Sequence, residues 1–73
     1  MTIVEENIKR ADELIERFLN LEGTKKFEAI NMAESIIFKD MAIASTIYNE
    51  VTVTDVLEVG DHFRKVTDKL LNI

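Results

Sequence analysis

The sequence predicts an all-α protein, a three-helix bundle built on an N-terminal αα-hairpin that associates with copies of itself. Its 73 residues contain two Gly and no Pro, so long helices meet few interruptions. Apolar residues recur at spacings of three and four along most of the chain. A composition of 47% hydrophobic and 32% charged residues is typical of folded proteins. We expect one helical domain over residues 1–73.

The first helix is predicted over residues 3–21. Thr2 can cap its start, and Glu5, three residues later, can reach back to complete a capping box. One face of the segment is apolar, and its main stripe contains Val4, Ile8, Ala11, Ile15 and Phe18. The opposite face carries acid–base pairs at a spacing of four, which is typical of a solvated helix surface.

The second helix is predicted over residues 25–49. Gly23 is suited to the left-handed conformation that ends a helix, and Thr24 can cap the next one. A connection of about two to four residues turns the second helix back beside the first as a hairpin. The apolar arc of this helix covers about half of its circumference and includes Ile43, Ile47 and Tyr48. So wide an arc indicates neighbours on two sides.

The third helix is predicted over residues 54–72. The alternating β-branched residues 51–54 are suited to an extended link or a short strand, and the helix is capped either by Thr52 with Asp55 or by Thr54. Gly60 falls on the buried side of this helix. A Gly inside a helix costs about 1 kcal/mol relative to Ala, so it marks either a close approach of two backbones or a tolerated weakness.

Asp40 is the most unusual residue of the second helix because it is predicted to lie in the middle of the apolar arc. An unpaired buried carboxylate is costly, so it needs a partner, water or a second chain. Arg64 is the cation best placed to pair with it, followed by Arg10 and Arg17. We therefore expect an Asp40–Arg64 pair, either within the bundle or across a dimer contact.

The overall charge argues against several classes of partner. With 14 acidic and 9 basic residues the net charge is −5, which disfavours binding to nucleic acid or to anionic membranes. The chain has no Cys and one His, and the Glu58–His62 pair would need ligands from a second chain to hold a metal. We expect no cofactor and no metal, a cytoplasmic location, and no enzymatic activity.

The first functional hypothesis is a small acidic interaction module, acting as a regulator, adaptor or inhibitor in homo-oligomeric form. Phe27 and Phe38 are eleven residues apart in the second helix, so they lie roughly in line at the edge of its polar side. Exposed aromatic residues are frequent anchors of protein contacts. With Asp40 and Arg64, they are the expected partner-binding residues, and the expected partner is a second copy of the chain or a protein target.

The alternative hypothesis is an oligomeric helical protein that captures a small anion containing phosphate. Residues 23–26 bring Thr24, Lys25 and Lys26 to the N-terminus of the second helix. Free backbone N–H groups at such a terminus, a hydroxyl and two ammonium groups suit a phosphate group. In this hypothesis these three residues bind the ligand.

Overall fold

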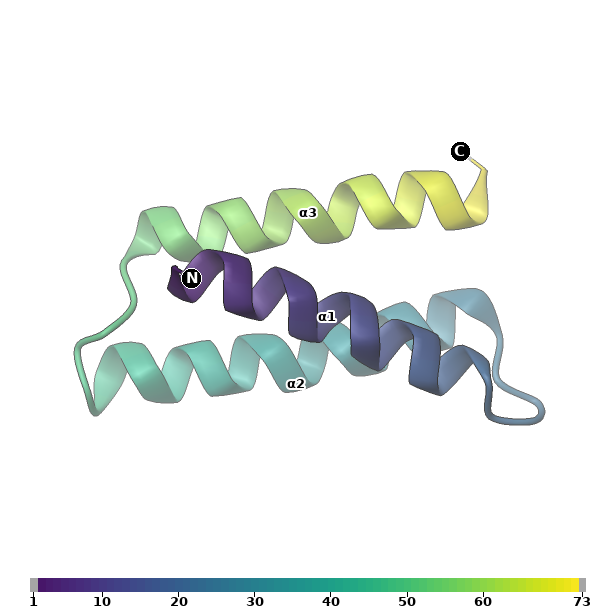
Figure 1. The fold of residues 1–73 in the computed structure, drawn as a ribbon, viewed down its shortest axis with the longest axis horizontal. Helices are drawn as coiled ribbons and strands as arrows, with labels where there is room; N and C mark the ends of the chain where they lie inside the picture. The colour runs from purple at the N-terminus through teal and green to yellow at the C-terminus, as the bar shows by residue number, and fades with distance from the viewer. Residues whose placement is uncertain (1, 73) are drawn as a thin grey trace.

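The chain forms three helices that run alternately in opposite directions. The computed structural model describes residues 2–72, and its helices are α1 (Ile3–Leu19), α2 (Lys26–Thr46) and α3 (Val53–Leu71), with no strand in that range. Each helix packs against the other two, and α1 and α3 point in the same direction (Figure 1). The prediction of an all-α, three-helix fold on an N-terminal hairpin is confirmed.

The start of α1 is capped as the sequence indicates. The Thr2 hydroxyl accepts a hydrogen bond from the Glu5 backbone N–H at 3.1 Å. The capping box is only half formed, because the Glu5 carboxylate accepts from the Thr2 hydroxyl at 3.2 Å and not from the Thr2 backbone. α1 ends at Leu19, two residues before the predicted end.

The connection between α1 and α2 is longer than predicted and spans residues 20–25. Gly23 takes the left-handed conformation with φ of 83°, as expected. Thr24, however, is not the cap of α2. Its backbone N–H donates to the Leu21 carbonyl and closes a turn, so the extended residue before α2 is Lys25. The hairpin forms, but with its second helix starting one residue late.

The end of α2 comes at Thr46, three residues before the predicted Asn49. Asn49 adopts φ of 53°, and the next backbone N–H, that of Glu50, donates back to the Ala44 carbonyl. Asn is one of the few residues that take this left-handed conformation at low cost. The helix therefore stops before Tyr48, and the chain turns toward α3.

The link into α3 is not a strand. Val51 is only 5% exposed and belongs to the core, so it fixes the link against the helices. Thr52 is the cap of α3: its hydroxyl accepts from the Asp55 N–H at 3.2 Å, while the Asp55 carboxylate accepts from the Thr52 N–H at 2.9 Å. This decides between the two predicted caps in favour of Thr52 with Asp55.

The core is narrow and consists of apolar residues from all three helices and the link. Its buried members are Ala11, Ile15, Ala29, Ile30, Ala33, Ile37, Met41, Val51, Val59 and Phe63. Ala11 of α1 and Ala29 and Ala33 of α2 are fully buried, so small side chains make up part of the core. No polar or charged residue is buried among residues 2–72. Side-chain packing therefore holds the bundle together, and polar contacts lie around its edges.

The lengths and hydropathy of the helices also bear on membrane insertion. Within residues 2–72, none of the three helices combines the length and the apolar character that a membrane-spanning helix requires.

Candidate functional site

Asp40 pairs with a different cation from the one expected. Its carboxylate contacts the guanidinium of Arg10 on α1, and both side chains are partly open to solvent, at 41% and 48% exposure. Arg64 instead pairs with Asp61 on its own helix at 2.7 Å. The prediction of an Asp40–Arg64 pair within the bundle is wrong. Asp40 lies at the edge of the α1–α2 contact, where its charge stays solvated, and not in the middle of a buried face.

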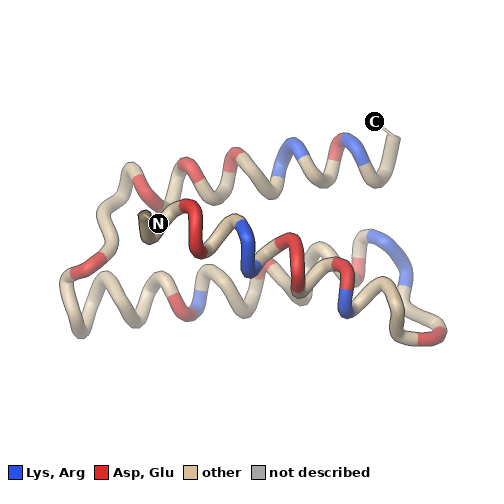
Figure 2. Tube along the Cα trace, viewed as in Figure 1, with Lys and Arg blue, Asp and Glu red and all other residues tan. Residues whose placement is uncertain are grey.

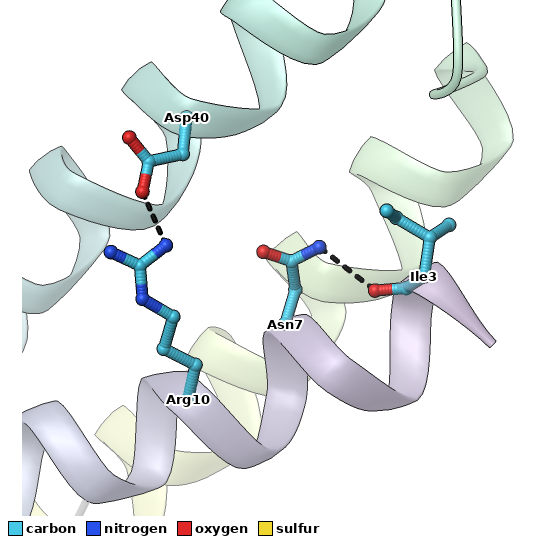
Figure 3. A network of polar contacts seen from close by, with 4 residues as sticks. All are labelled: Ile3, Asn7, Arg10 and Asp40. Carbon is cyan, nitrogen blue, oxygen red and sulfur yellow. Dashed lines mark hydrogen bonds and ion pairs between the residues drawn. The ribbon is translucent and has the colours of Figure 1, made fainter. Parts of the chain in front are cut away.

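A small hollow adjoins this pair where α1 begins and α2 ends. Its volume is about 230 Å³, and its lining includes Asn7, Arg10, Asp40 and the buried Val51. In Figure 3 the Arg10 side chain reaches across to Asp40, while the Asn7 amide nitrogen donates to the Ile3 carbonyl at 2.8 Å. The hollow is therefore a gap beside an ion pair.

Phe38 is a core-edge residue and not an exposed anchor. Its ring is partly buried, with its centroid 5.5 Å from that of Phe63 on α3. A Cβ added to Gly60 would meet the Phe38 ring at 3.9 Å, an ordinary contact with a side chain and not with a backbone. Phe38, Gly60 and Arg64 line one shallow groove of about 420 Å³ between α2 and α3. Phe38 and Arg64 thus line the same groove, and Phe27 is not one of its lining residues.

Phe27 is exposed at the opposite end of the bundle from the α2–α3 link. Half of its surface is open to solvent, and Leu21, in the α1–α2 connection, is 53% exposed. Lys25 and Lys26 lie between them and are exposed, and no ion pair involves either side chain within residues 2–72. We call Leu21, Lys25, Lys26 and Phe27 the hairpin-end surface.

The expected anion site at residues 23–26 contains a competing carboxylate. Glu28 lies in the first turn of α2, and its Oε1 accepts the Lys25 backbone N–H at 3.2 Å. The Thr24 N–H is also occupied, since it donates to the Leu21 carbonyl. An anion placed here would meet the Glu28 charge and find two of its backbone donors already bonded. These contacts make an anion site at residues 23–26 less favourable than the sequence pattern indicated.

The most exposed apolar side chains gather around the α2–α3 link. Val53, Ile47, Leu57 and Tyr48 are 76%, 68%, 67% and 64% exposed, more than any other large apolar residue described. All four fall within residues 47–57. Together with the acidic residues Glu50, Asp55 and Glu58, we call them the linker-end surface.

The linker-end surface was not predicted from the sequence, because the second helix was expected to continue to residue 49 and ends at Thr46. In a helix that reaches residue 49, Ile47 and Tyr48 would continue the apolar arc. Asn49 and the Thr52–Asp55 cap were the signals for an earlier helix end, since Asn tolerates the left-handed conformation and the cap fixes where α3 starts. Leu57 is 67% exposed and lines the groove between α2 and α3.

The linker end is acidic. Between Asp40 and Arg64 the sequence has no Lys or Arg, and Glu5 and Glu6 of α1 lie at the same end of the bundle. In Figure 2 the link and the adjoining helix ends carry red segments only, and the blue segments begin further along each helix. Further along α3, the Lys65 ammonium, and next the Arg64 guanidinium, hold the pKa of the Asp61 carboxyl below its ordinary value. The acids of the link end have no such cation partners within residues 2–72.

The single histidine connects two helices. His62 Nε2 on α3 lies 2.7 Å from Asp12 Oδ1 on α1. Its neighbour at a spacing of four, Glu58, makes no contact with it, and no cluster of metal-ligating side chains occurs within residues 2–72. His62 contributes to the α1–α3 contact through its approach to Asp12.

Comparisons with models of protein families, with curated proteins and with solved structures give no match to this chain.

Proposed function

We propose that this protein is a small helical interaction module that binds a second copy of itself, acting as a regulator, adaptor or inhibitor and not as an enzyme. The observation that carries the proposal is the gathering of Ile47, Tyr48, Val53 and Leu57 around one link, each at least 64% exposed. Scattered apolar side chains on a surface are ordinary, whereas a cluster at one place is typical of a contact site.

The polar residues support a binding role. Every described polar side chain is at least partly open to solvent, so no titratable group is shielded as catalytic groups usually are. The hollow beside Asp40 and the groove beside Phe38 have volumes of about 230 and 420 Å³, and the charged residues that line them are partly open to solvent. These features suit contact with another protein surface more than conversion of a small substrate.

The expected strength of self-association follows from the size of the cluster. Burying one Val, Leu or Ile side chain contributes about 1.5–3 kcal/mol. Association costs roughly 4–15 kcal/mol in lost freedom. The gain from four partly exposed side chains is of the same order as this cost, so we expect weak binding, with dissociation constants from about 1 μM to about 1 mM.

Sedimentation equilibrium across this concentration range tests the proposal. The wild-type chain is expected to increase in mass with concentration. Val53→Glu should remain monomeric, because it places a charge in the cluster. The substitution should not weaken α3, because residue 53 lies in its first turn, where the helix dipole favours an acidic side chain. Ser35→Glu, an exposed position in the middle of α2, adds the same charge as a control and should associate like wild type. A wild-type chain that stays monomeric up to about 1 mM contradicts the proposal.

A further inference from the structure

The link between α2 and α3 has the features of a hinge. It spans residues 47–52 and joins α3 to the α1–α2 hairpin (Figure 1). Its turn depends on Asn49, whose φ of 53° is a left-handed conformation that a residue with a side chain adopts at a cost. Neither Gly nor Pro occurs between Gly23 and Gly60, so the link lacks the two residues that most disfavour a helix. Residues 47–52 can therefore take a helical conformation as well as the turn.

The apolar pattern of α2 continues through the link. In one continuous helix from α2 into α3, an apolar face within about 80° around the axis would include Ile37, Met41, Tyr48, Val51 and Val59. All of these except Tyr48 are buried in the core of the closed molecule. A straightened link would therefore keep the core-facing sides of α2 and α3 on one side of a single long helix.

A straightened link would separate α3 from its own hairpin. The hairpin would then expose the surface that α3 covers, and α3 would expose the surface that packs on α1 and α2. A second opened copy supplies both missing parts, because its α3 carries the same residues. Exchange of α3 between two copies restores the contacts of the closed molecule, including Phe63 against Phe38 and His62 against Asp12.

We propose that this chain forms a dimer by exchanging α3, with residues 47–52 as the hinge. This inference rests on the proposed function and specifies how two copies associate. Each link runs from one half of the dimer to the other, so the two links pass each other at the crossing point. The exposed residues Ile47, Tyr48, Val53 and Leu57 gather there, where the two copies bury them against each other.

Two effects favour the closed molecule at low concentration. The Thr52–Asp55 capping box exists only in the closed form, and a continuous helix would turn Asp55 toward its apolar face. The crossing also brings two copies of Glu50 and Glu58 near each other, and like charges disfavour a contact. Release of the left-handed Asn49, new backbone hydrogen bonds through the link and burial of the exposed cluster act in the opposite direction. The exchanged dimer is therefore expected at high protein concentration.

Isotope-filtered NMR distinguishes the exchanged dimer from a contact between two closed molecules. Labelled and unlabelled chains are refolded together in equal amounts and brought to a concentration at which wild type associates. We expect a nuclear Overhauser effect between the Phe38 ring of one chain and the Phe63 ring of the other, because these ring centroids are 5.5 Å apart in an interface that now joins two chains. Effects between chains that are confined to Tyr48, Val53 and Leu57 would overturn the exchange and leave self-association standing.

Val53→Pro should block the open form without disturbing the closed one. Residue 53 is the first residue of α3, where Pro is well tolerated, and Thr52 before it is extended, as a residue before Pro should be. Inside a continuous helix, the same Pro would lack the N–H that bonds to the residue 49 carbonyl and would clash with that carbonyl. Val53→Pro is therefore expected to be monomeric where wild type dimerises. Val53→Ala, the matched control, also shortens the exposed side chain but permits a helix, so it should still dimerise.

Substitutions of Asn49 should shift the balance in both directions. Asn49→Ala should strengthen dimerisation at least about tenfold, because Ala favours the helix and disfavours the left-handed turn in both copies. Asn49→Gly should weaken dimerisation, because Gly adopts the left-handed conformation readily and disfavours the helix. Neither substitution changes an apolar residue of the linker-end surface. Circular dichroism of dilute samples should show that the substituted chains keep the helix content of the wild type.

Other outcomes separate the two proposals. If Val53→Pro dimerises as strongly as wild type, or if Asn49→Ala and Asn49→Gly behave alike, the exchange of α3 is overturned and self-association stands. A Val53→Ala variant that is as monomeric as Val53→Pro has the same consequence, because it shows that the side chain and not the backbone controls association. A wild-type chain that stays monomeric up to about 1 mM overturns both proposals.

Discussion

The Asp40 carboxylate on α2 pairs with the Arg10 guanidinium on α1, thirty residues away in the sequence. The pair spans the outer edge of the α1–α2 contact, and 41% of the Asp40 side chain and 48% of the Arg10 side chain remain exposed. Water therefore screens both charges. The pair helps to define how the two helices face each other, but it adds little to stability compared with the apolar core beneath it.

A double-mutant cycle on Arg10→Ala and Asp40→Ala measures this pair. We expect a coupling free energy of about 0.2–1 kcal/mol in urea unfolding, because exposed ion pairs are weak. The matched control combines Asp40→Ala with Arg64→Ala, and its two effects should simply add, since these residues are not paired within the chain. A coupling above about 2 kcal/mol for Arg10 and Asp40 would mean that the pair is shielded from solvent.

The two glycines are expected to respond in opposite directions to substitution by alanine. Gly60→Ala should stabilise the protein by about 0.5–1 kcal/mol, because Ala favours the helix and the added Cβ meets only the Phe38 ring at 3.9 Å. Gly23→Ala should destabilise it by about 1–2 kcal/mol, because residue 23 has φ of 83°. Thermal unfolding of both variants checks the pair of predictions. A destabilising Gly60→Ala would show that this part of α3 lies closer to α2 than described.

Thr52 and Thr54 differ in their contribution to α3 although both are exposed threonines near its start. Thr52→Ala should cost about 1 kcal/mol, because it removes the hydroxyl that accepts the Asp55 N–H. Thr54→Ala should change the free energy of unfolding by less than about 0.5 kcal/mol, because its hydroxyl makes no hydrogen bond within residues 2–72. Equal effects of the two substitutions in denaturant unfolding would contradict the assigned cap.

Asp61 provides a test of local electrostatics. Lys65, the larger cause, and Arg64 hold the pKa of its carboxyl below the ordinary value. A lowered pKa in the folded state stabilises the fold at pH above the unfolded pKa, and that contribution disappears as pH falls through the folded pKa. Because Asp61 is open to solvent, this effect on stability should be small and sensitive to salt.

Lys65→Met should raise the pKa of Asp61 toward its ordinary value, as measured by NMR titration of the carboxyl carbon. Arg64→Met should raise it by a smaller amount, because its interaction with the carboxylate contributes less. Lys69→Met removes a positive charge one turn further on and serves as the control, with little effect expected. An Asp61 pKa that does not change in Lys65→Met would show that this ammonium is too mobile to matter.

Local sequence patterns were sufficient for much of the fold. Thr2, Gly23 and the Thr52–Asp55 box act within a few residues of themselves, so the caps of α1 and α3 and the left-handed turn at Gly23 could be predicted without knowing the packing. Helix ends were less predictable. Those of α1 and α2 fell two and three residues short, because closing each turn depended on backbone hydrogen bonds across several residues.

The exposure of the two candidate aromatic residues was predicted correctly for Phe27 and incorrectly for Phe38. Phe27 was predicted to be exposed, and half of its surface is open to solvent. Phe38 was also predicted to be exposed, but its ring is partly buried and packs on Phe63 of α3. A helical wheel gives the direction of a side chain on one helix, and it contains no information on where the neighbouring helices lie.

The sequence by itself determined that this chain forms three amphipathic helices with an acidic surface, since hydrophobic spacing, capping residues and charge are local properties. Only the tertiary structure decided that Asp40 pairs with Arg10, that Phe38 packs on Phe63, and that the most exposed apolar residues gather around the α2–α3 link. The physical reason is that pairing and exposure depend on how the helices are rotated and where they end. Those quantities are set by packing between segments distant in the sequence.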